Sequence, residues 1–392
     1  MQPLKGITVV TLEHAIAAPF ATRQLADLGA RVIKIERPGS GDFARGYDAR
    51  VRGLASHFVW TNRSKESLTL DVKHPEAAAV LERLVLEKAD VVVQNLAPGA
   101  AARLGLGFER LAALKPGIIV CDISGYGADG PYRDKKAYDL LIQSEAGFVS
   151  VTGTPDEPCK AGTSMADIAA GMYACSNILA ALLQRAQTGR GQHIDISMLE
   201  SLVEWTSFPL YYAFDGAAPP PRTGAAHATI YPYGPFPTGD GGSVMLGLQN
   251  EREWLNFCAK VLLQPALATD PRFVGNASRS AERVALRAII VEAFQPLTAP
   301  QVLQRLEAAQ IANARVNTMQ DVWDHPQLKA RGRWRVVGSP VGALPALLPP
   351  GTWNDGPRMD PVPALGEHTD ALLGELGIDA SGIRALRAAG AV

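Results

Sequence analysis

The chain has 392 residues, of which 47% are hydrophobic and 20% are charged, and its formal net charge is −1. This length allows two domains, or one large domain with an insertion. The small net charge excludes the overall positive field that draws proteins to nucleic acids or membrane surfaces. An anionic ligand would therefore have to bind local clusters of basic residues.

The N-terminus and the cysteines bear on the cellular compartment. The N-terminus lacks the charged and apolar regions of a signal peptide, and we find no apolar run of the roughly 18 to 20 residues that a membrane span needs. The four cysteines are far apart and lack the spacing of metal ligands. These features predict a cytoplasmic protein with buried thiols, no metal site, and no membrane or nucleic-acid partner.

The first elements alternate between strand and helix. An apolar, β-branched run predicts a buried strand at 7–13, helical spacing predicts a helix over 18–29, and 31–36 reads as a second strand. This β-α-β start is typical of a parallel, doubly wound sheet. It suggests a dinucleotide site with Glu36 on a ribose. The first turn lacks the G-x-G-x-x-G pattern, however, which excludes NAD or FAD there.

The alternation continues to residue 198 and predicts an α/β fold with a Rossmann-like large domain. The further strands are expected at 67–72, 89–95, 118–124 and 192–198, and the helices at 75–87, 100–114 (in part) and 164–186.

Two segments rich in proline and glycine, 215–224 and 339–363, divide the rest of the chain. The region between them reads as strands near 229–237 and 243–248 around an Asp-Gly-Gly turn, then helices near 251–262, 281–293 and 299–309. A last helix is expected at 367–376. We predict that residues 1–214 begin the large domain, 225–330 form an inserted small α+β domain, and 331–392 return to complete the large domain.

Asp167 is the one charge near the start of the long apolar segment 162–184. Ser164 precedes it by three residues, as in a capping box, so helix capping is the simplest interpretation. The same position also suits catalysis, because the positive end of a helix would keep the carboxylate ionised. An ionised carboxylate on an apolar helix is a plausible covalent nucleophile.

Basic residues follow several of the predicted strands. Arg37 follows the second strand, Lys73 follows the third, and Arg103 comes soon after Asn95. Ligands of open α/β sheets bind at the carboxyl ends of the strands, where such cations could hold phosphates. Each of them read singly is a solvated charge at the start of a loop.

At these residues the sequence resembles the class III CoA-transferases, a family that includes formyl-CoA transferase and carnitine CoA-transferase. The resemblance covers nearly the whole chain. It is carried by the segments 28–39, 62–65, 70–73, 95–99, 125–127, 166–168, 316–317, 325–328 and 365–369.

The resemblance implies a function for Asp167 and a ligand for the cations. Asp167 would attack an acyl-CoA thioester, and an aspartyl anhydride and an aspartyl-CoA thioester would follow. CoA is then a substrate, and no tightly bound cofactor is expected. The implied CoA contacts are Arg37, Val72, Lys73, Asn95, Leu96, Arg103 and Lys136. The implied acyl-site residues are His14, Ala15, Ile16 and Tyr138. The family also implies a large domain built from both chain ends and an interlocked homodimer.

The branch of the family and the acceptor acid are less constrained. Related 2-methylacyl-CoA racemases carry Gly-His-Asp where this chain has Ala137-Tyr138-Asp139, and tyrosine is a poor base at neutral pH. This favours transfer over racemisation. Arg222 and His227 lie in a segment resembling the succinyl-CoA-dependent branch and are candidates for holding a distal carboxylate.

The expected acceptor is therefore a C4–C6 dicarboxylate such as itaconate, mesaconate, citramalate, malate or glutarate. An intramolecular mesaconyl-CoA transferase remains an alternative, as does a racemase. A non-catalytic CoA-binding subunit would not need Asp167.

Overall fold

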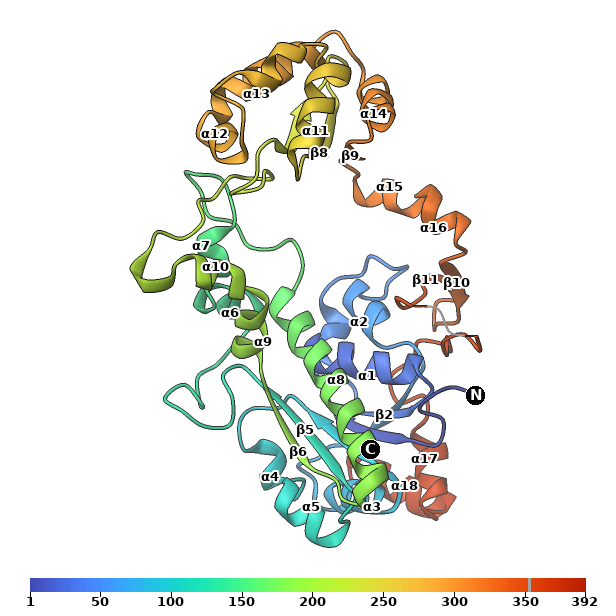
Figure 1. Cartoon of the computed structure of the whole chain (residues 1–392). Helices are drawn as coiled ribbons and strands as arrows, with labels where there is room; N and C mark the ends of the chain where they lie inside the picture. The colour runs from blue at the N-terminus through green and yellow to red at the C-terminus, as the bar shows by residue number, and fades with distance from the viewer. Residues whose placement is uncertain (352–353) are drawn as a thin grey trace. The chain divides into compact units, whose positions relative to one another are not determined.

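The computed structural model describes residues 1–351 and 354–392, which divide into two compact units (Figure 1). Unit 1 consists of Met1–Gly147, Ala161–Ser207 and Leu328–Val392, so it contains both ends of the chain. Unit 2 consists of Phe148–Lys160 and Phe208–Gln327.

Unit 1 is organised around a six-stranded sheet in which every neighbouring pair is parallel. The strands are β1 (Thr8–Leu12), β2 (Arg31–Glu36), β3 (Lys65–Thr69), β4 (Val91–Gln94), β5 (Ile119–Ser124) and β6 (His193–Ser197). Their order, β3-β2-β1-β4-β5-β6, is that of a doubly wound sheet. The predicted α/β class with a parallel sheet is confirmed. In such sheets the ligand crevice lies at the carboxyl ends where the order reverses, here between β1 and β4.

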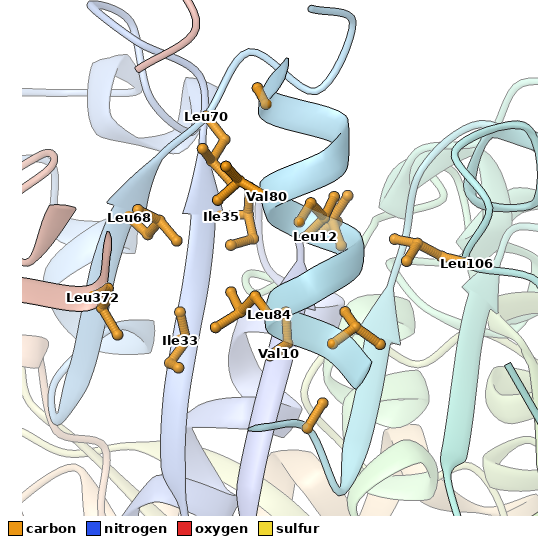
Figure 2. Close-up of a cluster of buried hydrophobic side chains, with 14 of the residues drawn as sticks. Val10, Leu12, Ile33, Ile35, Leu68, Leu70, Val80, Leu84, Leu106 and Leu372 are labelled. Atoms are coloured by element: carbon orange, nitrogen blue, oxygen red, sulfur yellow. The ribbon is translucent and has the colours of Figure 1, made fainter. Parts of the chain in front are cut away.

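Helices cover the sheet and close the core of unit 1. They are α1 (Ala17–Asp27), α2 (Ser56–Thr61), α3 (Pro75–Lys88), α4 (Ala100–Arg103), α5 (Phe108–Leu114), α6 (Asp139–Glu145), α8 (Met165–Thr188), α9 (Met198–Trp205), α17 (Thr369–Glu375) and α18 (Ala380–Ala388). Figure 2 shows one buried cluster, in which Val80 and Leu84 of α3 face Ile33 and Ile35 of β2. Leu372 of α17 joins this cluster, so the C-terminal segment completes the core that the N-terminal strands begin.

The α8 helix corrects one sequence expectation. Among the described residues it is long and apolar enough to cross a membrane, with a mean hydropathy of 1.4 in its most apolar window, whereas we expected no segment of that length. It packs against α1, α9, β5 and β6 of unit 1 (Figure 1). A core helix of a globular unit satisfies the same criteria, so length and composition here are weak evidence for a membrane span.

The third strand lies earlier than predicted, at 65–69 instead of 67–72. It begins with two charged residues, Lys65 and Glu66, which hydropathy does not assign to a strand. Lys65 is buried against Glu13, and Glu66 pairs with Arg31 on the neighbouring strand. At the other end, Asp71 accepts backbone N–H bonds and starts a turn. The contacts of Lys65 and Glu66 with other elements therefore make β3 start earlier than hydropathy predicts.

The C-terminal region of unit 1 contains two elements that the sequence did not predict. A hairpin of β10 (Trp334–Val337) and β11 (Leu344–Leu347) overlaps the segment read as a linker. The α18 helix follows the expected last helix, and Asp379 caps it by accepting the Gly382 N–H.

Unit 2 is a small α+β unit. Its sheet is antiparallel, with the order β7 (Tyr233–Pro237), β8 (Ser243–Gly247) and β9 (Ala312–Arg315), and the expected hairpin turn joins β7 to β8. Its helices are α7 (Phe148–Val151), α10 (Ser207–Tyr212, which starts at the boundary), α11 (Glu251–Asn256), α12 (Asn276–Ala281), α13 (Arg283–Phe294), α14 (Ala299–Ala308) and α15 (Met319–Trp323). The chain then enters α16 (Pro326–Ala330). Trp254, Phe257, Phe273 and Phe294 are fully buried in its core.

Candidate active site

The loop after β1 lies in the crevice between β1 and β4. The His14 N–H donates to Asn95 Oδ1 at 2.9 Å, and Asn95 Nδ2 donates to the His14 carbonyl at 2.9 Å. Ala15 has a φ of 60°. The side chain of Asn95, predicted to contact CoA, therefore holds the loop of predicted acyl-site residues. Ile16 in the same loop is buried.

Asp167 lies in the first turn of α8, and this end of the helix faces the crevice. β6 is parallel to the other strands and follows α8 after a short turn, so α8 runs antiparallel to the sheet. Its N-terminus therefore lies at the carboxyl edge of the sheet. Asp167 thus occupies the ligand-binding side of a doubly wound fold.

The capping interpretation of Asp167 is wrong. Ser164 is the N-cap residue, but its side chain makes no capping hydrogen bond. Asp139 caps the helix instead, because its Oδ1 accepts the N–H of Ala166 at 2.8 Å and of Asp167 at 3.3 Å. The Asp167 side chain is consequently not needed to cap its own helix.

The expected ionisation of Asp167 is also corrected. Protein atoms crowd the carboxyl group of this partly exposed residue, and this burial, with the nearby Asp139 carboxylate, raises the pKa of Asp167 to about 7. A hydrogen bond from the Ala17 backbone N–H favours the ionised form and opposes the increase. The helix end does not keep this carboxylate fully ionised. The pKa of Asp167 lies near neutral pH, as the pKa values of functional carboxyl groups often do.

A glycine allows α1 to approach α8 beside Asp167. A Cβ on Gly171 would lie 2.7 Å from the Ala17 carbonyl oxygen and 2.9 Å from Phe20 Cδ1. Gly171 lies four residues after Asp167, on the same side of α8. The absence of a side chain therefore brings the first turn of α1 against the reactive end of α8.

Tyr47 is a site residue that sequence reasoning missed. Burial raises the pKa of Tyr47 to about 12, and the nearby acidic groups Asp42, Asp167 and Tyr138 add to the shift. Its ring contacts Phe43, with ring centroids 5.7 Å apart. Its hydroxyl group is a proton donor close to Asp167 that no motif marked. Tyr138, which was predicted, is the N-cap residue of α6 and is 71% exposed.

The cations predicted to bind CoA are exposed. Arg37 directly follows β2, Lys73 lies four residues beyond β3, Arg103 ends α4, and Lys136 precedes α6. In residues 1–351 and 354–392, none of these four forms an ion pair with a protein carboxylate. All four charges are therefore available to an anion. The predicted contacts Val72 and Leu96 are partly buried against the core.

Arg222 and His227 belong to unit 2. Three nitrogens of Arg222 donate to the backbone carbonyls of Ser150, Thr154 and Pro155 at 2.9 to 3.3 Å, so this side chain joins two segments of the unit. This use differs from the distal-carboxylate contact that we expected. His227 stacks on Tyr233, and its Nδ1 accepts a backbone N–H at 3.1 Å, which leaves Nε2 to carry the proton.

Metal-ligand sets are not found in the described part of the chain, where no three or more His, Cys, Asp or Glu side chains come together.

Sequence comparison decides the family. Residues 4–369 match CoA-transferase family III. The chain belongs to this family. It is 37% identical to the "Succinate--glutarate CoA-transferase" of Agrobacterium fabrum, an alignment that covers 95% of this chain and 96% of the relative. It is 33% identical to the human "Succinyl-CoA:glutarate CoA-transferase", over 100% of this chain and 90% of the relative.

Solved structures agree with this assignment. The crystal structure of a CAIB/BAIF family protein from Brucella suis superposes with a TM-score of 0.83 at 36% sequence identity, and covers 95% of this chain and 99% of that one. In this family III CoA-transferase, the carboxyl group of Asp167 thus lies at the carboxyl edge of the sheet, where ligands of doubly wound folds bind.

Proposed function

We propose that this CoA-transferase moves CoA from succinyl-CoA to a C4–C6 dicarboxylate, with Asp167 as the covalent nucleophile. The observation that carries the proposal is that Asp139 caps α8, so the Asp167 carboxyl group stands at the crevice without a structural duty. A carboxylate held in this way can attack a thioester.

The proposed reaction has four balanced steps. An Asp167 oxygen bonds to the thioester carbon and CoA leaves as the thiolate, which gives an aspartyl–succinyl anhydride. The thiolate attacks the Asp167 carbonyl carbon, forms the aspartyl-CoA thioester and releases succinate. The acceptor carboxylate then attacks this thioester and frees the thiolate again. Attack of the thiolate on the acceptor's acyl carbon restores Asp167 and releases the new acyl-CoA. The covalent route retains the thioester energy.

Two sets of groups would support these steps. Arg37, Lys73, Arg103 and Lys136 would hold the CoA phosphates, since each is exposed and free of protein carboxylates in the described structure. The Ala17 N–H, which already binds the Asp167 carboxyl group, would stabilise the oxyanion that develops on that group.

For the acceptor we propose glutarate first, and itaconate, mesaconate, citramalate or malate next. The two relatives named above support glutarate through their names. His227, with its proton on Nε2, is the proposed donor to the distal carboxylate. Arg222 is proposed to position the segment that contains both residues, through its hydrogen bonds to the Thr154 and Pro155 carbonyls.

The test is an acceptor panel with succinyl-CoA as the donor. We expect C4–C6 dicarboxylates to accept CoA, and Asp167→Asn to lower the rate by roughly three orders of magnitude or more. Preference for oxalate or for a monocarboxylate would refute the acceptor class. Near-wild-type transfer by Asp167→Asn would refute the nucleophile.

The alternatives give different results in the same assays. A racemase would exchange the α-proton of a 2-methylacyl-CoA in D₂O without any acceptor acid. An intramolecular transferase would isomerise mesaconyl-CoA without a second acid. We further propose a cytoplasmic, interlocked homodimer, for which light scattering of the purified protein and fractionation of cells are the measurements.

A further inference from the structure

The acyl-site loop contains a strained residue. Ala15 has a φ of 60°, a left-handed conformation that is sterically unfavourable for a residue with a Cβ. Such a conformation persists only where the surroundings hold it. Asn95 fixes both backbone groups of His14, and the Ala15 N–H donates to Asp42 Oδ1 at 3.1 Å. Asp42 is therefore the partner of the strained residue itself.

Asp42 is held in turn by a buried set of charges. Its side chain is 0% exposed, its Oδ1 also accepts the Ala44 N–H at 2.9 Å, and its Oδ2 accepts from Lys34 Nζ at 2.8 Å. Lys34 lies 3.3 Å from Glu13 Oε1, to which Lys65 Nζ donates at 2.6 Å. Two lysines and two carboxylates thus contact each other, and all four side chains are 0% exposed. Each position is fixed by at least two contacts, so Asp42 cannot move freely.

The turn at Ala15 determines where the next N–H groups point. Two residues later, the Ala17 N–H is close enough to the Asp167 carboxyl group to lower its pKa. Gly171 allows the same residue to lie close to α8. A loop that relaxed from the left-handed conformation at Ala15 would redirect this N–H and remove it from Asp167.

We propose that Asp42 is a positioning residue for the reaction: by holding the left-handed turn at Ala15, it keeps the Ala17 N–H on the Asp167 carboxyl group. The proposal rests on the proposed function of Asp167. Lys34 has a role as well, because this residue of β2 donates to Asp42 Oδ2 and so holds the Asp42 side chain in place.

The test compares Asp42→Ala with Asp42→Asn. Both variants remove the negative charge and the ion pair with Lys34, but only asparagine keeps an oxygen that can accept the Ala15 N–H. The pH dependence of the transfer rate is the readout. The groups facing Asp167 are Asp139, Tyr47 and the Ala17 N–H, and the first two are the same in both variants.

We expect Asp42→Ala to transfer CoA about 10- to 100-fold more slowly than Asp42→Asn, as a misplaced reacting group does. The acid limb of its pH profile should lie at higher pH, because an Asp167 without the Ala17 hydrogen bond is harder to ionise. CoA affinity, measured by calorimetry, should be equal in the two variants. Equal rates and equal acid limbs would overturn the proposal and leave Asp42 a structural residue.

A folding control keeps the test decisive. Asp42→Ala leaves Lys34 buried without its nearest carboxylate and can unfold the protein. Lys34→Met is therefore combined with each Asp42 substitution, which removes the buried charge in both, and the two double variants are compared in the same way. Failure of the proposed function is separate: it is shown by an active Asp167→Asn, whatever the Asp42 variants do.

Discussion

At the scale of single residues, the proposed reaction depends on the ionisation of Asp167. The sequence placed this carboxylate at a helix N-terminus and suggested that the helix would keep it ionised. Its pKa is instead raised to about 7, because burial and Asp139 outweigh the Ala17 hydrogen bond. Transfer that depends on the ionised form should therefore decline below about pH 7.

Asp139, whose negative charge lies near Asp167, gives the first prediction. Asp139→Asn keeps an oxygen that can cap α8 but removes a negative charge near Asp167. Because that charge raises the pKa of Asp167, its loss should move the acid limb of the transfer rate to lower pH. The pH profile of succinyl-CoA consumption measures this. An acid limb that moved upward or stayed in place would contradict the assignment.

The stability of Asp167 variants gives the second prediction. A carboxyl group with a raised folded pKa binds its proton more tightly in the folded than in the unfolded protein. The folded state is therefore penalised as pH rises from about 4 to about 7, and the penalty is absent below that range. Asp167→Asn should raise Tm at pH 8 by on the order of 2 °C and have little effect at pH 4. A larger effect at pH 4 than at pH 8 would be inconsistent with the raised pKa.

At the scale of elements, the sequence predicted strands well where apolar residues run along their length. The bounds of β2 were predicted correctly at 31–36, because Val32, Ile33 and Ile35 mark the strand although charged residues lie between and beside them. β3 was misplaced because Lys65 and Glu66 lie in it. Their buried partners come from other elements, and one-dimensional hydropathy contains no such information.

The candidate site shows the same limit. Asp167 and three of the exposed cations, Arg37, Lys73 and Arg103, were suggested by chemistry and spacing, whereas Lys136 was implied only by the family resemblance. Tyr47 was missed because it lies in an irregular segment without a motif, and only the folded chain brings it near Asp167. The cap supplied by Asp139 was missed because this residue precedes Asp167 by 28 positions and belongs to another helix.

The contact between α1 and α8 gives the third prediction. Gly171→Ala places a Cβ 2.7 Å from the Ala17 carbonyl, and must push the two helices apart. We expect a loss of about 1–3 kcal/mol in unfolding free energy and a lower transfer rate. Gly374→Ala is the matched control, because Gly374 lies in α17 and a Cβ added there would have no neighbouring atom within 4 Å. Alanine should be neutral or stabilising there. Equal effects of the two variants would refute the tight approach.

At the scale of the whole molecule, the buried charges of Glu13, Lys34, Lys65 and Asp42 connect the first strands of the sheet to the loop at Ala15. Burial alone would raise the pKa of Glu13, but Lys65 and Lys34 lower it to about 2. A carboxylate of this kind stabilises the folded protein above its unfolded pKa of about 4.5, and this contribution is lost as pH falls towards 2. Acid should therefore unfold the protein partly through this cluster.

Glu13→Gln tests this role and gives the fourth prediction. It leaves two buried lysines short of a carboxylate, so we expect a loss of about 3–5 kcal/mol at pH 7. The difference from wild type should shrink as pH falls below about 4.5, where Glu13 of the unfolded chain takes up its proton. Urea unfolding at several pH values measures both quantities, with the exposed Glu307→Gln as the control. A pH-independent difference would contradict the linkage.

If the proposed mechanism holds, Asp167 carries CoA during the reaction. The direct measurement is mass spectrometry of the protein after a short incubation with succinyl-CoA alone, followed by proteolysis. We expect CoA attached to the peptide that contains Asp167, conversion of that adduct to a hydroxamate by hydroxylamine, and no adduct in Asp167→Asn. An adduct on another residue, or rapid transfer by an Asp167→Asn enzyme, would contradict it.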